Sequence, residues 1–447
     1  MAYVLGIDIG GTHVTAAIGR LVDGSWKRPA PVRLRGDSDE APAVLHVDPD
    51  GSLQVGDPAE RGPVLRPGVV AREFAGRIGA DAPVLLRGER WSPQTLTAIV
   101  ARRVTDLIHG REGEPPVRVV LAHPATFTAH HIAALRAALA DVALAAEPLP
   151  EPVLAAEGHA ARGGTGGRAL AVLAAGGTGY EASVVTRTNP ITYAVRATRT
   201  GAEQLGGADL DEALAHHAAE QLRRETGPLD PADERHLRIL HELRAECRYT
   251  REQLSHADEA EIILPLHPGE ARLTVTRATF EELARPLLDH PAATLARVVE
   301  AAGVPPHHLA GVLLTGGLAQ TPLLAELVAG HLPGVTLLPP GGSTLVAEGA
   351  AAVAAQLAAG LHDAPPDTGR RDNAVWEPEP GQEPSVLPAP ATGTRGQLPD
   401  APPRPPVKIS TPELPGRRRI RRAQGMNASA TALVLAIGAL APVTPIG

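Results

Sequence analysis

Residues 4–18, VLGIDIGGTHVTAAI, align without a gap on residues 170–184, LAVLAAGGTGYEASV, at an offset of 166 positions. Each stretch consists of an apolar run, a Gly-Gly-Thr sequence and a second run, which predicts two strands joined by a tight turn. Two copies of this unit in one chain indicate a duplicated fold, whose halves face each other across a cleft. Because strand and helix patterns alternate along the rest of residues 1–362, the fold class is α/β.

Composition excludes several classes of protein. The chain has 447 residues, of which 43% are hydrophobic and 21% charged, so it is neither fibrous nor disordered throughout. A net charge of −8 gives no electrostatic reason for the whole chain to bind nucleic acid. The single cysteine, Cys247, excludes an internal disulfide. The start, MAYVLGIDIGG, lacks the basic region of a signal peptide, so we expect a cytoplasmic protein.

The composition changes near residue 362. We expect lobe I over residues 1–167 and lobe II over residues 168–362. Residues 363–416 contain 14 prolines in 54 positions, which predicts a disordered linker. Residues 417–447 form a tail with five arginines followed by an apolar stretch that is too short to span a membrane. Two interpretations stay open, weak association with the inner face of the membrane and an unstructured end.

The hydrophobic patterns predict the main elements of the body. A capping box from Thr279 to Glu282 predicts one further helix start. Strands are expected at 4–8, 14–18, 117–121, 169–173, 182–186, 191–197 and 312–314, and helices at 94–109, 129–140, 208–225, 231–254 and 344–359.

Glycine turns at strand ends suit a phosphate-bearing ligand. Backbone N–H groups of glycines approach phosphate oxygens without a Cβ in the way. A third pair, Gly316-Gly317, follows the strand at 312–314, at the carboxyl end where ligands of α/β sheets bind. Three such turns together favour a nucleotide over three unrelated loops. The turn residues that would contact its phosphates are Gly10, Gly11, Thr12, Gly176, Gly177, Thr178 and Gly179.

Several blocks resemble the nucleotide-binding domain of the 70-kDa heat-shock chaperones (DnaK-type), in the same order. GIDIGGTHVTAAI and AAGGTGYEASVV resemble that family's two phosphate loops, and LGGADLD at 205–211 is similar to its most specific block. EPVLAAEGHAA, LRAECRYTREQLS and LLTGGLAQTPLL match further segments. The resemblance covers roughly residues 1–360. It implies an actin-like ATPase (ribonuclease H-like) fold that binds ATP or ADP with Mg²⁺.

The resemblance also implies a role for individual residues. Asp8 would hold hydrated Mg²⁺, and Glu151 would couple the nucleotide state to the segment around Pro124; these two are the expected catalytic residues. His13 would join the phosphate contacts of the first loop. The residues expected around the ribose and adenine are Gly207, Arg248, Arg251, Ser255, Gly316 and Gly317.

Two departures from the family concern hydrolysis. Ala174 stands where the family has its second catalytic Asp, and Glu60 stands where it has its hydrolytic lysine. Phosphoryl transfer requires positioned water and neutralised oxygen charge, which a methyl group cannot supply. A neighbour such as Asp209 would have to compensate. The expected function is therefore a nucleotide-dependent conformational switch with weak or absent ATP hydrolysis.

Two alternatives remain open at this stage. A ROK-like sugar kinase shares DIGGT, but it places Glu-x-Gly-His after the second turn and needs several cysteines in a zinc loop. A non-hydrolysing, nucleotide-gated interaction protein differs from the ATPase only in the chemistry around Asp8, Ala174 and Glu60. The 87 residues after residue 360 are too few and too rich in proline for a client-binding domain, so an unknown protein partner would respond to the nucleotide.

Overall fold

A computed structural model describes residues 1–48, 53–56, 70–164, 167–189, 192–201, 205–230, 232–266 and 269–360. These residues all belong to one compact unit, Met1–Arg370, and Arg371–Gly447 form a second unit. The predicted linker and tail therefore lie outside the described residues. None of the helices described is long and apolar enough to cross a membrane.

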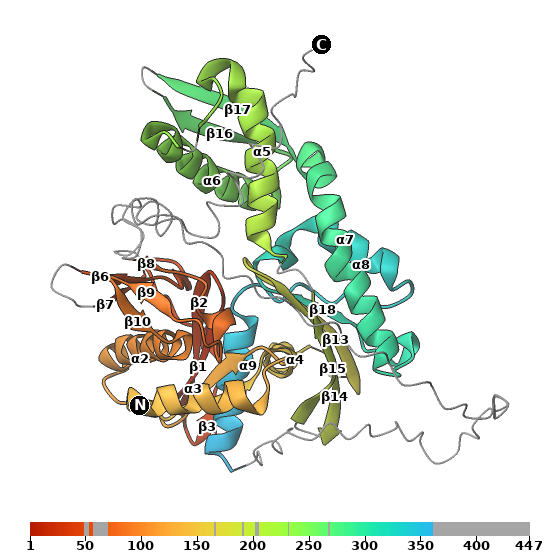
Figure 1. The fold of residues 1–447 in the computed structure, drawn as a ribbon. Coiled ribbons are helices and arrows are strands. Elements are labelled where there is room, and N and C mark those ends of the chain that lie inside the picture. The colour runs from red at the N-terminus through yellow and green to blue at the C-terminus, as the bar shows by residue number, and fades with distance from the viewer. Residues whose placement is uncertain are drawn as a thin grey trace, which may run out of the picture. The chain divides into compact units, whose positions relative to one another are not determined.

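The first half is built on a mixed sheet (Figure 1). Its central hairpin is β1 (Tyr3–Ile9) and β2 (His13–Val22), and β1 also pairs in parallel with β11 (Val119–His123). Small two- and three-stranded sheets extend this half. The other strands are β3 (Ser25–Trp26), β4 (Ala30–Pro31), β5 (Glu40–Pro42), β6 (Leu45–Val47), β7 (Leu53–Val55), β8 (Val70–Ala71), β9 (Val84–Leu86), β10 (Glu89–Trp91) and β12 (Glu147–Pro150).

The second half repeats this arrangement. Its hairpin is β13 (Ala169–Ala175) and β14 (Tyr180–Asn189), and β13 pairs in parallel with β18 (Val312–Thr315). The strand order is β15-β14-β13-β18, where β15 is Thr192–Thr200. A separate hairpin, β16 (Glu259–Pro265) with β17 (Glu270–Thr276), follows later in the chain. The repeat predicted from the sequence is thus a repeat of structure, with the same antiparallel and parallel neighbours around β1 and β13.

Helices cover both faces of each sheet. On the outer faces, α2 and α3 pack on the first sheet, and α7 packs on the second (Figure 1). Between the sheets, α9 packs on β1 and β11, α4 packs on β13, β14 and β15, and the two helices cross each other. The helices are α2 (Pro93–Glu112), α3 (Ala129–Asp141), α4 (Glu151–Ala161), α5 (Gly207–Thr226), α6 (Glu234–Leu254), α7 (Arg277–Ala301), α8 (Pro322–His331) and α9 (Leu345–Ala358).

One predicted helix start is wrong. The capping box from Thr279 to Glu282 is not the beginning of α7, which starts at Arg277. The cap is Thr276, whose hydroxyl accepts a hydrogen bond from the backbone N–H of Thr279 at 3.2 Å. Since β17 ends at Thr276, the strand runs directly into the helix and leaves no room for a cap three residues later.

Other boundaries differ by a few residues. The strand expected at 117–121 lies at Val119–His123, because its register is determined by pairing with Leu5–Ile7 of β1. The helix expected from Pro231 begins at Glu234 after the cap Asp233, whose carboxylate accepts from Arg235 N at 2.7 Å.

Candidate nucleotide site

The two glycine turns have the same backbone geometry. Gly10 N donates to His13 O at 2.9 Å in the first turn, and Gly176 N donates to Gly179 O at 2.9 Å in the second. Each turn follows an internal strand of its sheet, β1 or β13, and lies at the carboxyl end of that strand. The sequence repeat therefore places two equivalent sets of backbone N–H groups at equivalent positions.

The two turns also face each other. A Cβ placed on Gly11 would overlap the hydroxyl of Thr178, and a Cβ placed on Gly177 would overlap the side chain of Thr12. These reciprocal contacts relate the turns by a pseudo-twofold axis. Neither position admits a side chain, so both glycines are needed for the approach of the two halves.

Two carboxyl groups lie beneath the turns. Asp8 is on β1, and Glu151 is the first residue of α4. Desolvation raises the pKa of Asp8 to about 7. Desolvation, followed by the charges of Asp8 and Glu181, raises the pKa of Glu151 well above its usual value. Within the part of the chain that the structure describes, neither carboxyl group has a hydrogen-bond partner. Asp8 is thus a partly buried acid at the end of β1, next to the first glycine turn.

A third carboxylate joins the two halves. Glu181 on β14 is only 6% exposed, and its oxygens accept from Ala125 N and Thr126 N, both at 3.1 Å. The hydroxyls of Thr126 (3.2 Å) and Ser183 (3.4 Å) donate to the same carboxylate. Because Ala125 and Thr126 follow β11 in the first half, Glu181 ties the second sheet to the segment after Pro124.

Glu181 was not among the residues predicted from the sequence. It lies directly opposite Ala174 in the β13–β14 register, and its side chain shares that face of the sheet. The carboxylate that is missing at 174 is therefore present on the neighbouring strand. The sequence contains a sign of this carboxylate, because Ala174 lies two residues before the second turn and Glu181 lies two residues after it. The alignment with Asp8, however, points to position 174 alone.

Helices α5 and α6 close the site beside the second turn. Gly207 N donates to Gly176 O at 3.0 Å, so the start of α5 is bound to the turn. Arg251 on α6 lies against Gly207, is 8% exposed and pairs with Asp211 at 2.6 Å. Arg248 lies three residues before Arg251 on α6, hence on the same face. Ser255 follows the last residue of α6, and its hydroxyl donates to the carbonyl oxygen of Arg251 at 3.4 Å.

The third glycine pair contacts the second turn's strand. Gly316 has a φ of 88°, and a Cβ there would overlap the Ala175 carbonyl oxygen. Gly317 begins a short 3-10 helix, Gly317–Gln320, directly after β18. This pair therefore lies beside the end of β13, where the resemblance expects the adenosine loop.

Two residues that the sequence analysis considered for ATP hydrolysis are not found in such a role among the described residues. Glu60 lies outside the described residues. Asp209 does not compensate for Ala174 in this structure, because its carboxylate accepts from Gly206 N at 2.7 Å and caps its own helix. Among the described residues, no three His, Cys, Asp or Glu side chains are grouped as a metal site would require.

The family model described as "Hsp70 protein" matches residues 70–364. The chain belongs to the Hsp70 family. It carries an Hsp70-type nucleotide-binding domain, as its resemblance predicted. The matched range contains the second turn, α5, α6 and the Gly316-Gly317 pair, and it begins after the first turn.

A curated relative of this Hsp70-family chain is the chaperone protein DnaK of Endomicrobium trichonymphae. It is 25% identical over 343 residues, which cover 74% of this chain and 54% of the relative. The chain spans about half the length of that relative.

Proposed function

We propose that residues 1–360 bind Mg²⁺ with ADP or ATP between the two glycine turns, and that this nucleotide drives a conformational switch with weak or absent hydrolysis. The observation that carries this proposal is the reciprocal packing of the turns, Gly11 on Thr178 and Gly177 on Thr12. Backbone N–H groups at two facing turns can bind a polyphosphate from both sides. Members of the Hsp70 family bind ATP and ADP with Mg²⁺, which agrees with this arrangement.

The acidic residues suit Mg²⁺ that arrives with phosphates. Mg²⁺ is commonly held by one or two carboxylates, water and substrate phosphates rather than by a cage of protein ligands. Asp8, a partly buried carboxyl without a hydrogen-bond partner among the described residues, fits this role, and it lies near enough to Glu151 for its charge to raise the pKa of Glu151. Bound Mg²⁺ would neutralise charge on the phosphate oxygens. Ala174 has no carboxylate, and the carboxylate of Glu181 opposite it is engaged by the backbone N–H groups of Ala125 and Thr126, which supports weak or absent turnover.

Calorimetric titration of the full chain with ADP and ATP tests the binding. We expect binding that needs Mg²⁺, together with a phosphate-release rate far below that of a DnaK measured in parallel. Absence of binding to both nucleotides would refute the proposal. Binding together with turnover equal to that of the reference protein would refute only the part that concerns hydrolysis.

Glu181 can transmit a displacement of the second glycine turn to the segment after β11. It lies two residues after Gly179 and holds the backbone of Ala125 and Thr126. A nucleotide that displaces the second turn would therefore displace β14 and, through this carboxylate, the segment after β11. An unknown protein partner would then respond to the position of that segment.

Amide hydrogen exchange measures this link. In the wild type, we expect Mg²⁺–ADP to change the protection of Ala125 and Thr126. Glu181→Gln removes one of the two acceptor oxygens, so it should lower the protection and abolish its response to nucleotide. Ser183→Ala is the matched control, because it leaves both N–H bonds intact. An unaltered response in Glu181→Gln would exclude Glu181 as the link.

A further inference from the structure

A buried ion pair joins α5 to α6 beside the second glycine turn. Asp211 is the last residue of the block LGGADLD, and its carboxylate accepts a hydrogen bond from Arg251 Nε at 2.6 Å. The side chains of Arg251 and Asp211 are 9% and 15% exposed. Because removing two charges from water costs free energy, a buried ion pair is weak evidence of stabilisation and requires another explanation.

The guanidinium group of Arg251 lies against the start of α5. A Cβ placed on Gly207 would lie 3.5 Å from Arg251 Nη2 and 3.6 Å from Gly177 Cα, so the arginine and the second turn contact the same glycine. The start of α5 is itself bonded to that turn, since Ala208 N donates to Gly177 O at 2.8 Å. Gly207 and Asp211 are one helical turn apart, hence on the same face of α5. The ion pair therefore lies beside the second turn.

The bond to Asp211 leaves the terminal nitrogens of Arg251 available. A guanidinium group is a rigid plane with five N–H donors, so a bond to Nε fixes the direction of Nη1 and Nη2. Among the described residues, neither terminal nitrogen forms a hydrogen bond, and Nη2 lies 3.5 Å from the half-exposed carboxylate of Glu252. Since Nη2 faces Gly207, these donors point to the space beside the second turn.

A second ion pair joins the same two helices. Glu212, the next residue of α5, pairs with Arg244 on α6 at 2.6 Å. The side chains of Arg244 and Glu212 are 28% and 33% exposed, so this pair lies nearer the solvent than the pair of Arg251 and Asp211. Both pairs attach α5 to α6, which makes the second one a measure of attachment alone.

We propose that Asp211 is a positioning residue, which holds the Arg251 guanidinium where its terminal nitrogens donate to oxygen atoms of the bound nucleotide. This inference rests on the proposed nucleotide site and adds to it a residue that does not contact the ligand. Asp211 also balances a charge that would otherwise be buried without a partner. Because the carboxylate already orients the guanidinium, nucleotide binding does not have to immobilise it.

Calorimetric titration of the full chain with Mg²⁺ and ADP measures this role. Asp211→Asn keeps the shape of the side chain and removes its charge, so it should weaken ADP binding roughly 10-fold through the loss of a charged hydrogen bond. Glu212→Gln is the matched control, because it removes the neighbouring ion pair between the same helices and should leave ADP affinity unchanged. Thermal unfolding establishes that the variants are folded. If Asp211→Asn is unfolded, Asp211→Glu replaces it, since it keeps the charge but displaces it by one methylene.

A double substitution shows whether Asp211 acts through Arg251. Arg251→Gln should weaken ADP binding at least as much as Asp211→Asn does, and the combined variant should bind no more weakly than Arg251→Gln alone. A purely structural role predicts additive losses and weaker binding by Glu212→Gln, and either result would overturn the inference. Wild-type affinity in Asp211→Asn or in Arg251→Gln would overturn it too. Failure of the wild type to bind ADP would instead refute the proposed nucleotide site, and this inference with it.

Discussion

A substitution at Gly177 tests directly whether the nucleotide binds between the two glycine turns. Gly177→Val would drive a side chain into Thr12 across the cleft, separating the two turns as well as obstructing the phosphates. We expect loss of ADP binding in calorimetry with the fold retained. Gly110→Ala on α2 is the control, because a Cβ there meets no atom within 4 Å and the residue lies outside the glycine turns. Binding by Gly177→Val as tight as that of the wild type would mean that the nucleotide lies elsewhere.

Ala174 and Glu60 concern turnover rather than binding. Ala174→Asp with Glu60→Lys should raise the rate of phosphate release at least ~10-fold, equivalent to about 1.4 kcal/mol of barrier. The new carboxyl would lie beside Glu181, whose charge would raise its pKa, so the assay belongs at pH 8. Unchanged release with normal nucleotide affinity would show that these two positions do not limit hydrolysis.

His123 makes stability depend on pH. Its ring is 5% exposed and stacks on Phe127, with 5.6 Å between the ring centroids. Burial lowers the pKa of His123 below 6.5, the carbonyl of Pro124 opposes this, and the charge of Arg136 adds to it. Because the unfolded chain takes up this proton more readily, the contribution to stability is complete above pH 6.5 and is lost as pH falls below it.

Urea unfolding at pH 7.5 and pH 5.5 measures this contribution. Acids with raised pKa, such as Glu181, change stability in the opposite direction, so the comparison is between wild type and variant. His123→Phe should reduce the loss of stability on acidification by up to about 1.4 kcal/mol per pH unit. Phe127→Leu removes the stacking partner and should keep the wild-type pH dependence. Identical dependence in His123→Phe would rule out this residue.

At the scale of elements, the crossing of α4 and α9 holds the two sheets together. A Cβ on Gly349 would overlap the carbonyl oxygen of Leu154, and one on Gly158 would overlap that of Leu345. The helices thus meet backbone to backbone. Arg162, which follows α4, reaches Glu348 on α9 at 2.6 Å, and Glu348 is 4% exposed. Small residues and one internal ion pair therefore set the separation of these helices.

Gly349→Ala tests the close approach. We expect it to lower the free energy of unfolding by about 1–3 kcal/mol, because the methyl group must push the helices apart. Gly330→Ala in α8, where a Cβ meets no atom within 4 Å, should leave stability unchanged or slightly raised. Chemical denaturation compares the two variants. If Gly349→Ala is as stable as the wild type, the crossing can relax without cost.

At the scale of the whole molecule, the tail at 417–447 lies outside the described residues, and its role is a proposal from charge alone. Each of its five arginines would contribute ~1 kcal/mol near an anionic surface, an attraction that salt weakens. We expect sedimentation with anionic vesicles that falls at high salt and is lost when residues 417–447 are deleted, with nucleotide affinity unchanged. Equal sedimentation with neutral vesicles would exclude the electrostatic attraction.

Local sequence was sufficient for the features that depend on neighbours in the chain. The two strand–turn–strand units, most helices, the glycine turns and the family resemblance all follow from residues close together in sequence. The hairpin of β1 and β2 is an example, since both strands and the turn lie within residues 3–22. Boundaries were less accurate, because pairing with a distant strand shifted β11 and the end of β17 displaced the cap of α7.

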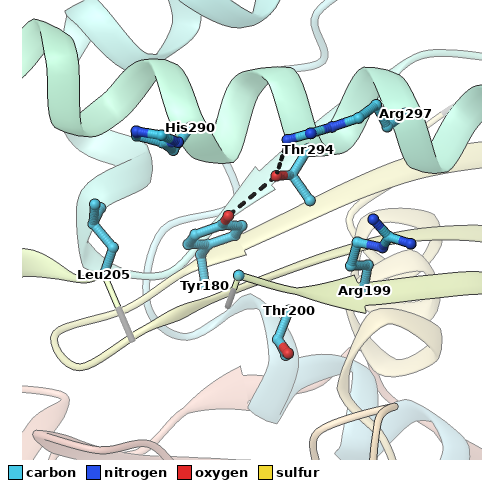
Figure 2. Close-up of a pocket in the computed structure, with 8 residues that line it drawn as sticks. Tyr180, Arg199, Thr200, Leu205, His290, Thr294 and Arg297 are labelled. Carbon is cyan, nitrogen blue, oxygen red and sulfur yellow. Dashed lines mark hydrogen bonds between the residues drawn. The ribbon is translucent and has the colours of Figure 1, made fainter. Parts of the chain in front are cut away.

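Only the tertiary structure decided which distant residues share a site. Glu181 could be recognised as the carboxylate opposite Ala174, and as the link to Ala125 and Thr126, only once strand register and the packing of the two halves were known. Asp209 was a candidate from sequence until its role as a helix cap became visible. Tyr180 on β14 and Thr294 on α7 also meet, with 3.1 Å between their hydroxyl oxygens, although 114 positions separate them in the sequence (Figure 2). Hydrophobic periodicity determines which face of an element is buried, whereas register and helix packing determine which side chains meet, and these depend on contacts far apart in the chain.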